Sequence, residues 1–176
     1  MNRQREDLTP AQWPDCPIEV AALLFFDIET TGLRPDRGAR ITEVAVLDGQ
    51  GLRFTWEQED RADGLDELFP TLFDHLGAGV VVGHNVGFDF RFVSYVASRQ
   101  GYEGPNVRFI DTLALARNVL EVDDYRLATL VESCGISPEG DLHTARVDVR
   151  ATEAIFWELV ERGGIETLSD AGMKRL

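Results

Sequence analysis

The sequence predicts an α/β fold in three layers, with a mixed central sheet flanked by helices. Three short apolar or alternating segments come first and are spaced as a meander of strands. After them, short apolar runs alternate with stretches in which apolar residues recur at helical spacing. A length of 176 residues is enough for one domain that buries most of its apolar surface.

The first half of the chain is expected to form the meander and one helix. The apolar run at 23–28 predicts a buried strand, and a loop is expected at 30–38. The alternating RITEVAVL at 40–47 and LRFTW at 52–56 predict a strand pair joined by the turn DGQG. An acidic connection, EQEDRADG, then leads to a helix from residue 65, where leucine and phenylalanine recur at helical spacing.

The second half is expected to alternate strands and helices. Strands are expected at 80–82 and 107–110 and helices near Asp89, at 112–120, 126–134 and 145–161, where glycines follow the last two. The domain division that follows has an irregular arm at 1–19, which contains three prolines, a folded domain at 20–163 and a short tail at 164–176.

The net charge of −14 has the wrong sign for a protein that holds nucleic acid by its overall field. Affinity for a phosphate backbone normally comes from lysine and arginine, which release counterions. A nucleic-acid partner would therefore require a local feature, such as a bound metal or a short basic strip.

Nothing in the sequence predicts a membrane protein. The longest apolar run, Val20 to Phe26, is far too short to cross a bilayer, and the first residues are polar and mixed in charge. Two cysteines without metal-site spacing are expected to be reduced. The expected compartment is the cytoplasm.

The segment FFDIETTGL places Asp27 and Glu29 at the end of the first buried strand. Residues two apart in a strand share a face, so both carboxylates point the same way. A divalent cation such as Mg²⁺ or Mn²⁺ would neutralise such a pair. By itself the pair is better explained by a strand end whose carboxylates cap the next turn or are simply exposed.

Two later segments carry further polar residues near helix starts. GHNVGFDF brings Asp89 to the beginning of a helix, where the helix dipole alone would favour a carboxylate. LHTARVDVRAT carries His143 and Asp148. Because residues five apart on a helix are separated by about 140°, a shared site requires His143 before the helix and Asp148 in its second turn. Each segment alone also fits an ordinary surface residue.

Together the segments match the requirements of two-metal phosphodiester hydrolysis. Two ions can hold a scissile phosphate, lower the pKa of the attacking water and stabilise the leaving oxygen. Four carboxylates and two divalent ions balance in charge, and histidine titrates near neutral pH as a base. This combination also explains how an acidic protein could bind a phosphate.

The three segments resemble, in order and spacing, the exonuclease motifs of the DEDDh 3′–5′ exonucleases. This DnaQ-like group includes the proofreading epsilon subunit of bacterial DNA polymerase III and has a ribonuclease-H-like fold. The similarity covers about residues 22 to 160 and includes ITEVAV at 41–46, DT at 111–112 and LATLVESCGI at 127–136. His143 followed by Asp148 matches the histidine form of the third motif.

The resemblance implies a metal-dependent 3′–5′ exonuclease that releases 5′-mononucleotides from DNA in proofreading or repair. It implies four metal ligands for two Mg²⁺ or Mn²⁺ ions, one general base and three contacts to the terminal nucleotide. The ligands are Asp27, Glu29, Asp89 and Asp148, the base is His143, and the nucleotide contacts are Thr30, Leu33 and Phe88.

One departure concerns the acidic connection at 57–64. Many relatives carry a longer segment with a His-Gly-Ile motif there, and this chain does not. This connection is either a trimmed, solvated loop, which is the favoured reading, or the mark of a looser substrate grip. An acidic rim there would also repel long polyanions.

Substrate and partners stay open between alternatives. The expected substrates are single-stranded DNA or frayed 3′ ends, and the alternatives are RNA ends, short oligonucleotides, or a role as an inactive nuclease-like binding module. Because all five catalytic positions are filled, the binding module is the least favoured. The short tail favours an independent enzyme over one docked on a DNA polymerase.

Overall fold

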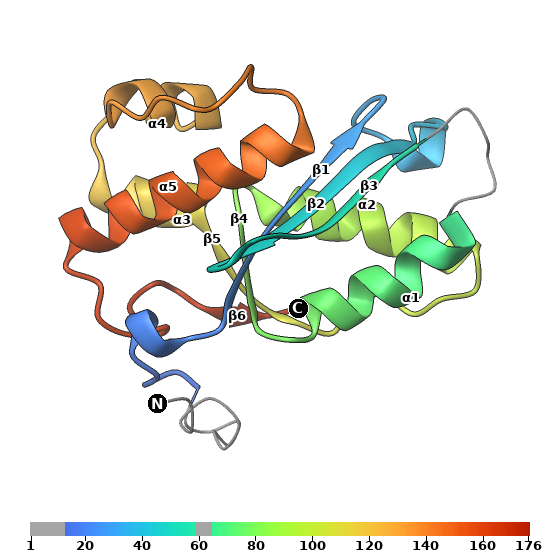
Figure 1. The fold of residues 1–176 in the computed structure, drawn as a ribbon, viewed down its shortest axis with the longest axis horizontal. Helices are drawn as coiled ribbons and strands as arrows, with labels where there is room; N and C mark the ends of the chain where they lie inside the picture. Colours follow the sequence, from blue (N-terminus) through green and yellow to red (C-terminus); the bar gives the residue numbers. More distant parts are fainter. Residues whose placement is uncertain (1–12, 59–64) are drawn as a thin grey trace.

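A computed structural model describes residues 13–58 and 65–176 (Figure 1). Its sheet has six strands in the order β3-β2-β1-β4-β5-β6. The strands are β1 Leu23–Thr30, β2 Ile41–Asp48, β3 Gly51–Glu57, β4 Val80–Gly83, β5 Arg108–Asp111 and β6 Lys174–Arg175. The helices are α1 Leu65–Leu76, α2 Val86–Arg99, α3 Thr112–Val119, α4 Leu127–Ser133 and α5 Ala145–Gly163, with short 3₁₀ turns at η1 Ile18–Val20 and η2 Pro35–Arg37.

Strand β1 lies at the centre of the sheet and pairs antiparallel with β2 and parallel with β4. Its first four residues are all buried, because helices cover both faces of the sheet at this point. Helices α3, α4 and α5 pack on one face, and α1 and α2 pack on the other. The predicted three-layer fold with a mixed sheet is therefore confirmed.

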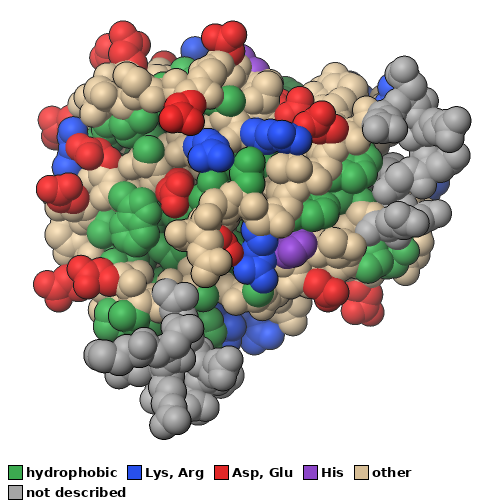
Figure 2. All heavy atoms as spheres, viewed as in Figure 1, with side chains coloured by type: hydrophobic (Ala, Val, Ile, Leu, Met, Phe, Trp, Pro, Cys, Tyr) green, Lys and Arg blue, Asp and Glu red, His purple; other side chains and the backbone are tan. Residues whose placement is uncertain are grey.

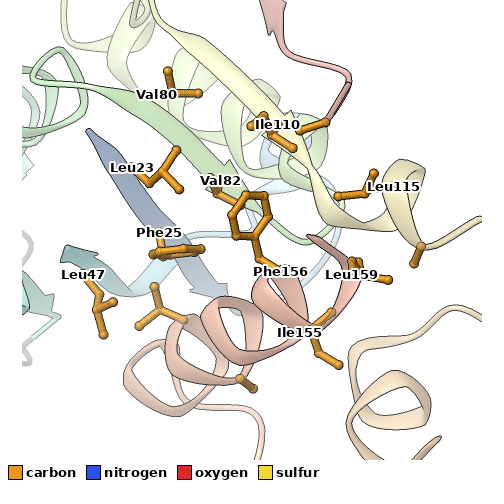
Figure 3. Packing of buried hydrophobic residues seen from close by; sticks show 14 of the residues in the cluster. Leu23, Phe25, Leu47, Val80, Val82, Ile110, Leu115, Ile155, Phe156 and Leu159 are labelled. Carbon is orange, nitrogen blue, oxygen red and sulfur yellow. The ribbon is translucent and has the colours of Figure 1, made fainter. Parts of the chain in front are cut away.

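Two neighbouring phenylalanines of β1 divide the core between the two faces. Phe25 meets Phe156 of α5 with ring centroids 5.6 Å apart, and Figure 3 shows the two side chains facing each other. Phe26 points the other way and stacks on Phe90 of α2 with centroids 5.9 Å apart. Because side chains alternate along a strand, this central strand holds both hydrophobic clusters in place and fixes the position of the residues that follow it.

The strands and helices expected from the sequence are present within a few residues, with one addition at the sheet edge. Strand β6 pairs antiparallel with β5, where Phe109 lies opposite Lys174. The segment from Trp13 to Val20 also packs on the C-terminal tail, since Ile18 N donates to Glu166 O at 2.9 Å.

Parts of two expected segments lie outside the described residues, namely 1–12 of the arm and 59–64 of the acidic connection. Within the described part of the chain, every helix is too short or too polar to cross a membrane.

Candidate active site

The predicted carboxylates meet in one cleft of about 560 Å³ beyond the C-terminal ends of β1 and β4. The cleft is lined by Asp27 and Glu29 from β1, Asp89 from α2 and Asp148 from α5. Size does not distinguish it, because a hollow of about 710 Å³ lies beside the C-terminal half of α5. The convergence of four acids from three elements does distinguish it.

Asp27 is the most confined of the four acids. Its Oδ2 is buried and has no hydrogen-bond partner in the described part of the chain. Burial raises the pKa of this carboxyl well above the usual range of aspartate, and the neighbouring carboxylates of Asp89 and Asp148 raise it further. A buried anion without a donor is costly, so this oxygen is arranged for a cation rather than for the protein itself.

Asp89 is positioned by the strand that it faces. It lies in the first turn of α2 and is only 4% exposed. Its Oδ1 accepts a hydrogen bond from the backbone N–H of Ile28 at 3.2 Å, which joins α2 to β1 between the two acids of that strand. Burial raises the pKa of Asp89, although its backbone hydrogen bonds oppose the shift.

The third predicted segment brings His143 and Asp148 to the rim of the same cleft. The backbone N–H of His143 donates to Asp148 Oδ1 at 3.0 Å. The spacing suggested that Asp148 lies in the second turn of the helix. Because α5 begins at Ala145, Asp148 lies in the first turn instead. One ligand atom each from Glu29, His143 and Asp148 lie within 4.8 Å of one another.

His143 adopts a backbone conformation that few residues tolerate. Its φ is +83°, in the left-handed region, and the next residue, Thr144, is extended. Histidine, asparagine and aspartate are enriched among non-glycine residues with positive φ. This bend turns the chain immediately before α5 and leaves His143 exposed beside the carboxylates.

A fifth acid, Glu43 of β2, stands next to the predicted group. It lies directly opposite Glu29 in the β1–β2 register, and like charges in that position repel. Its Oε2 accepts a hydrogen bond from the N–H of Ala145 at 2.9 Å, so it holds the start of α5. Its charge also contributes to the raised pKa of Glu29, after burial and Asp148.

The three residues predicted to contact the terminal nucleotide are not placed alike. Phe88 lines the cleft beside Asp89, with its ring 5.8 Å from that of Phe92. Thr30 donates its hydroxyl to Gly32 O at 2.9 Å, and Leu33 is 79% exposed in the following loop. Neither of the last two lines the cleft, and their role stays a prediction.

Hydrogen bonds hold His84 and Asn85, the second and third residues of GHNVGFDF, in place. His84 Nδ1 lies 3.0 Å from Thr112 Oγ1, and Asp111 Oδ1 accepts from the N–H of Asn85 at 2.9 Å. The same carboxylate oxygen accepts from Leu113 N at 3.0 Å and caps α3. Asp111 and Thr112 therefore anchor the turn into α2, a role that the DT dipeptide alone did not reveal.

The donors in the cleft suit a hard divalent cation. Carboxylate oxygens are the ligands that Mg²⁺ and Mn²⁺ prefer, and several of these carboxylates gain little from the protein itself. The unpartnered Oδ2 of Asp27 is the clearest case. Burial is the first cause of the raised pKa values of Asp27, Glu29, Asp89 and Asp148, and bound cations would stabilise the charged forms of these carboxyls.

A mixed α/β sheet with acids gathered beyond its central strands defines a class of protein, the nucleases with a ribonuclease-H-like fold. The nuclease domain of 3′hExo, a DEDDh family member solved with rAMP, superposes with a TM-score of 0.63 over 81% of this chain and 93% of that chain, at 14% identity. At this identity the likeness shows the fold.

Sequence comparison supplies the family. The profile of the RNase T type, described as Exonuclease, matches residues 53–156, and the chain belongs to this exonuclease family, which consists of hydrolytic nucleases. The matched region contains Asp89, His143 and Asp148 and begins after Asp27 and Glu29.

Longer relatives contain a similar segment. A PolC-type DNA polymerase III from Thermotoga petrophila is 31% identical over 89% of this chain but only 13% of its own length. The 3′-5′ exonuclease DinG from Bacillus subtilis is 26% identical over 79% of this chain and 18% of its own length. The chain thus spans less than a fifth of either relative.

Proposed function

We propose that the protein is a 3′–5′ exonuclease that uses two divalent metal ions, Mg²⁺ or Mn²⁺, to release 5′-mononucleotides from DNA. The observation that supports this most directly is the convergence of Asp27, Glu29, Asp89 and Asp148 in one cleft, with an unpartnered buried oxygen on Asp27. The 3′–5′ direction is proposed by analogy with the relative DinG, a 3′-5′ exonuclease.

Each site residue has a distinct task in the proposed reaction. The four carboxylates hold the ions, which when bound would neutralise the phosphate, acidify the attacking water and stabilise the leaving 3′ oxygen. His143 accepts the proton of the attacking water from its exposed position beside Glu29 and Asp148. Water adds to the phosphorus of the last phosphodiester, and the bond from that phosphorus to the 3′ oxygen of the preceding nucleotide breaks. This oxygen takes up a proton from solvent and stays on the shortened strand as a hydroxyl, and the phosphate leaves on the 5′ end of the mononucleotide.

The biological setting belongs to the same proposal. We place the enzyme in the cytoplasm, acting on single-stranded or frayed 3′ ends in proofreading or repair, because its relatives include DNA polymerase III of the PolC type. A DNA polymerase is accordingly the protein partner to test. RNA ends are the alternative substrate, since the 3′hExo structure holds rAMP and the carboxylates act on a phosphodiester that DNA and RNA share.

The test is a gel time course on 5′-labelled single-stranded DNA and RNA of one sequence, with Mg²⁺, Mn²⁺ or EDTA. Wild type should give a ladder that shortens from the 3′ end only with metal, and the faster strand identifies the preferred sugar. Glu29→Ala should abolish most turnover by removing a metal ligand. Activity that survives thorough chelation would contradict the metal mechanism.

His143→Asn tests the base without disturbing the loop, because asparagine tolerates the positive φ of +83° at this position. The variant should stay folded and lose turnover by about 10²–10⁴-fold. The matched control is His75→Asn, since His75 accepts a hydrogen bond from Arg53 outside the cleft. Full activity in His143→Asn would rule out the assigned base.

A further inference from the structure

The cleft does not end at the carboxylates but continues over α3 and the segment that joins it to α4. Its lining there includes Arg117 of α3 and Asp124, Tyr125 and Arg126 of the connecting segment. This part of the wall has no assigned role in the chemistry at the metals. It borders the site on one side and differs from it in charge.

Neither arginine of this wall belongs to an ion pair among the described residues, although the charge of Arg126 adds to the effect of hydrogen bonds in lowering the pKa of Asp124. The ion pairs found in the described ranges, 13–58 and 65–176, use Arg34, Arg53, Arg146 and Arg162 instead. Arg117 and Arg126 are both exposed. The nearby acid, Asp124, accepts the backbone N–H of Arg126 at 2.9 Å and so closes a local turn.

Tyr125 lines the same wall, next to Arg126 in the sequence and beside Arg117. Its hydroxyl donates to Leu120 O at 3.0 Å, which fixes the ring against the chain. The guanidinium of Arg117 lies 5.8 Å from the ring centroid, within the range of a cation–π contact. A held aromatic ring beside cations is the surface on which single-stranded nucleic acids stack their bases while phosphates meet the charges.

The overall charge of the molecule makes local positive charge beside the site important for binding a strand. The chain carries −14 overall, and on the face shown in Figure 2 acidic side chains are spread around the surface with basic ones between them. A strand that enters a cleft lined by carboxylates needs positive charge beyond that of the metals, and phosphate contacts from arginine supply both affinity and register.

We propose that Arg117, Tyr125 and Arg126 form a subsite for the substrate strand on the 5′ side of its terminal nucleotide. The arginines contact backbone phosphates, and the ring of Tyr125 packs on a base or sugar. This subsite rests on the proposed function, because it takes the same cleft as the entry to the nuclease site. It also answers how an acidic protein holds more than the last nucleotide.

The test measures binding separately from hydrolysis. Fluorescence anisotropy of a labelled 12-nucleotide single strand with Mn²⁺ gives Kd between 50 and 200 mM KCl, with every protein in the His143→Asn background so that the strand persists. Arg117→Ala and Arg126→Ala should each raise Kd about tenfold. Each should also flatten the slope of log Kd against log salt by about 0.7.

Arg99→Ala is the matched control. Arg99 is an exposed arginine in the last turn of α2, so its removal makes the same change in net charge away from the cleft. The subsite would be overturned if Arg117→Ala and Arg126→Ala gave the same Kd and salt slope as Arg99→Ala. It would also be overturned if the His143→Asn protein bound no strand at low salt.

Hydrolysis by the otherwise wild-type enzyme separates the two proposals. Absent cleavage with the expected Kd changes would reject the nuclease proposal and support the subsite. Normal cleavage with no Kd change in the arginine variants would reject the subsite alone.

Discussion

At Asp27 the carboxylate has a buried Oδ2 for which the described residues, 13–58 and 65–176, supply no hydrogen-bond donor. Because burial and neighbouring carboxylates raise its pKa in the folded state, the folded protein holds more protons than the unfolded chain above the ordinary pKa of aspartate, about 4. Stability therefore falls as pH rises from that value through the raised pKa. Asp27 therefore favours cation binding and lowers the free energy of unfolding of the protein without a cation.

We expect Asp27→Asn to stabilise the metal-free protein by about 1–3 kcal/mol near pH 8, because the amide removes a buried charge that lacks a partner. The melting temperature in EDTA should rise by about 2–4 °C per kcal/mol, and the gain should shrink toward pH 4. Added Mn²⁺ should raise the melting temperature of wild type but not that of the variant.

Asp74→Asn provides the control, since Asp74 is an exposed acid on α1 and its loss makes the same change in net charge. An equal gain in both variants would mean that general repulsion, and not the cleft, limits the stability of the metal-free protein.

Among the secondary-structure elements, β2 and α5 are joined at the site through Glu43. We expect Glu43→Ala to lower the free energy of unfolding by about 0.5–2 kcal/mol, as loss of a helix cap does, and to weaken Mn²⁺ binding. The reason is that Glu43 Oε2 accepts a hydrogen bond from Ala145 N, in the same first turn of α5 that carries Asp148. Urea unfolding and calorimetric titration with Mn²⁺ measure the two effects.

Two variants define what Glu43 contributes. Glu43→Gln keeps an acceptor oxygen and should lose less Mn²⁺ affinity than the alanine variant. Glu57 lies on the neighbouring strand β3 and forms an exposed ion pair with Arg146 of α5; Glu57→Gln removes this ion pair and should stay within about 0.5 kcal/mol of wild type. Unchanged Mn²⁺ affinity in Glu43→Ala would show that the hydrogen bond does not position α5.

The elements were predictable where apolar residues repeat or run together. The first strand reads directly from its apolar run because β1 is buried on both faces, and α2 reads from its helical spacing. Strand β6 was not predictable, since Lys174 and Arg175 carry no periodicity and pair only because the tail returns to β5. Short polar edge strands are specified by tertiary contact alone.

The carboxylates of the site were predictable from the sequence, but the contacts that position them were not. Asp27 and Glu29 share a face by strand geometry, which local sequence reveals. The role of Glu43 depends on register with Glu29 and on a contact with Ala145 at a separation of 102 residues, which local sequence does not encode. The early position of Asp148 in its helix follows from the left-handed bend at His143, which no glycine marks.

Across the whole molecule, two hydrophobic clusters share one sheet. Phe156→Ala and Phe90→Ala each remove a buried ring from one face and should each destabilise by about 3–5 kcal/mol. Because Phe25 and Phe26 are adjacent in β1, loss of either cluster should unfold both. Urea transitions followed by tryptophan fluorescence and far-ultraviolet circular dichroism should coincide; separate midpoints would mean that the faces unfold independently.

The residues of the site come from segments far apart in the sequence. Asp27 and Glu29 lie on β1, and Asp148 lies on α5. A nascent chain on the ribosome in which α5 and the loop before it have not yet been synthesised contains Asp27 and Glu29. It still lacks His143 and Asp148. The proposed catalytic group is therefore complete only once α5 has been synthesised and has packed on the sheet.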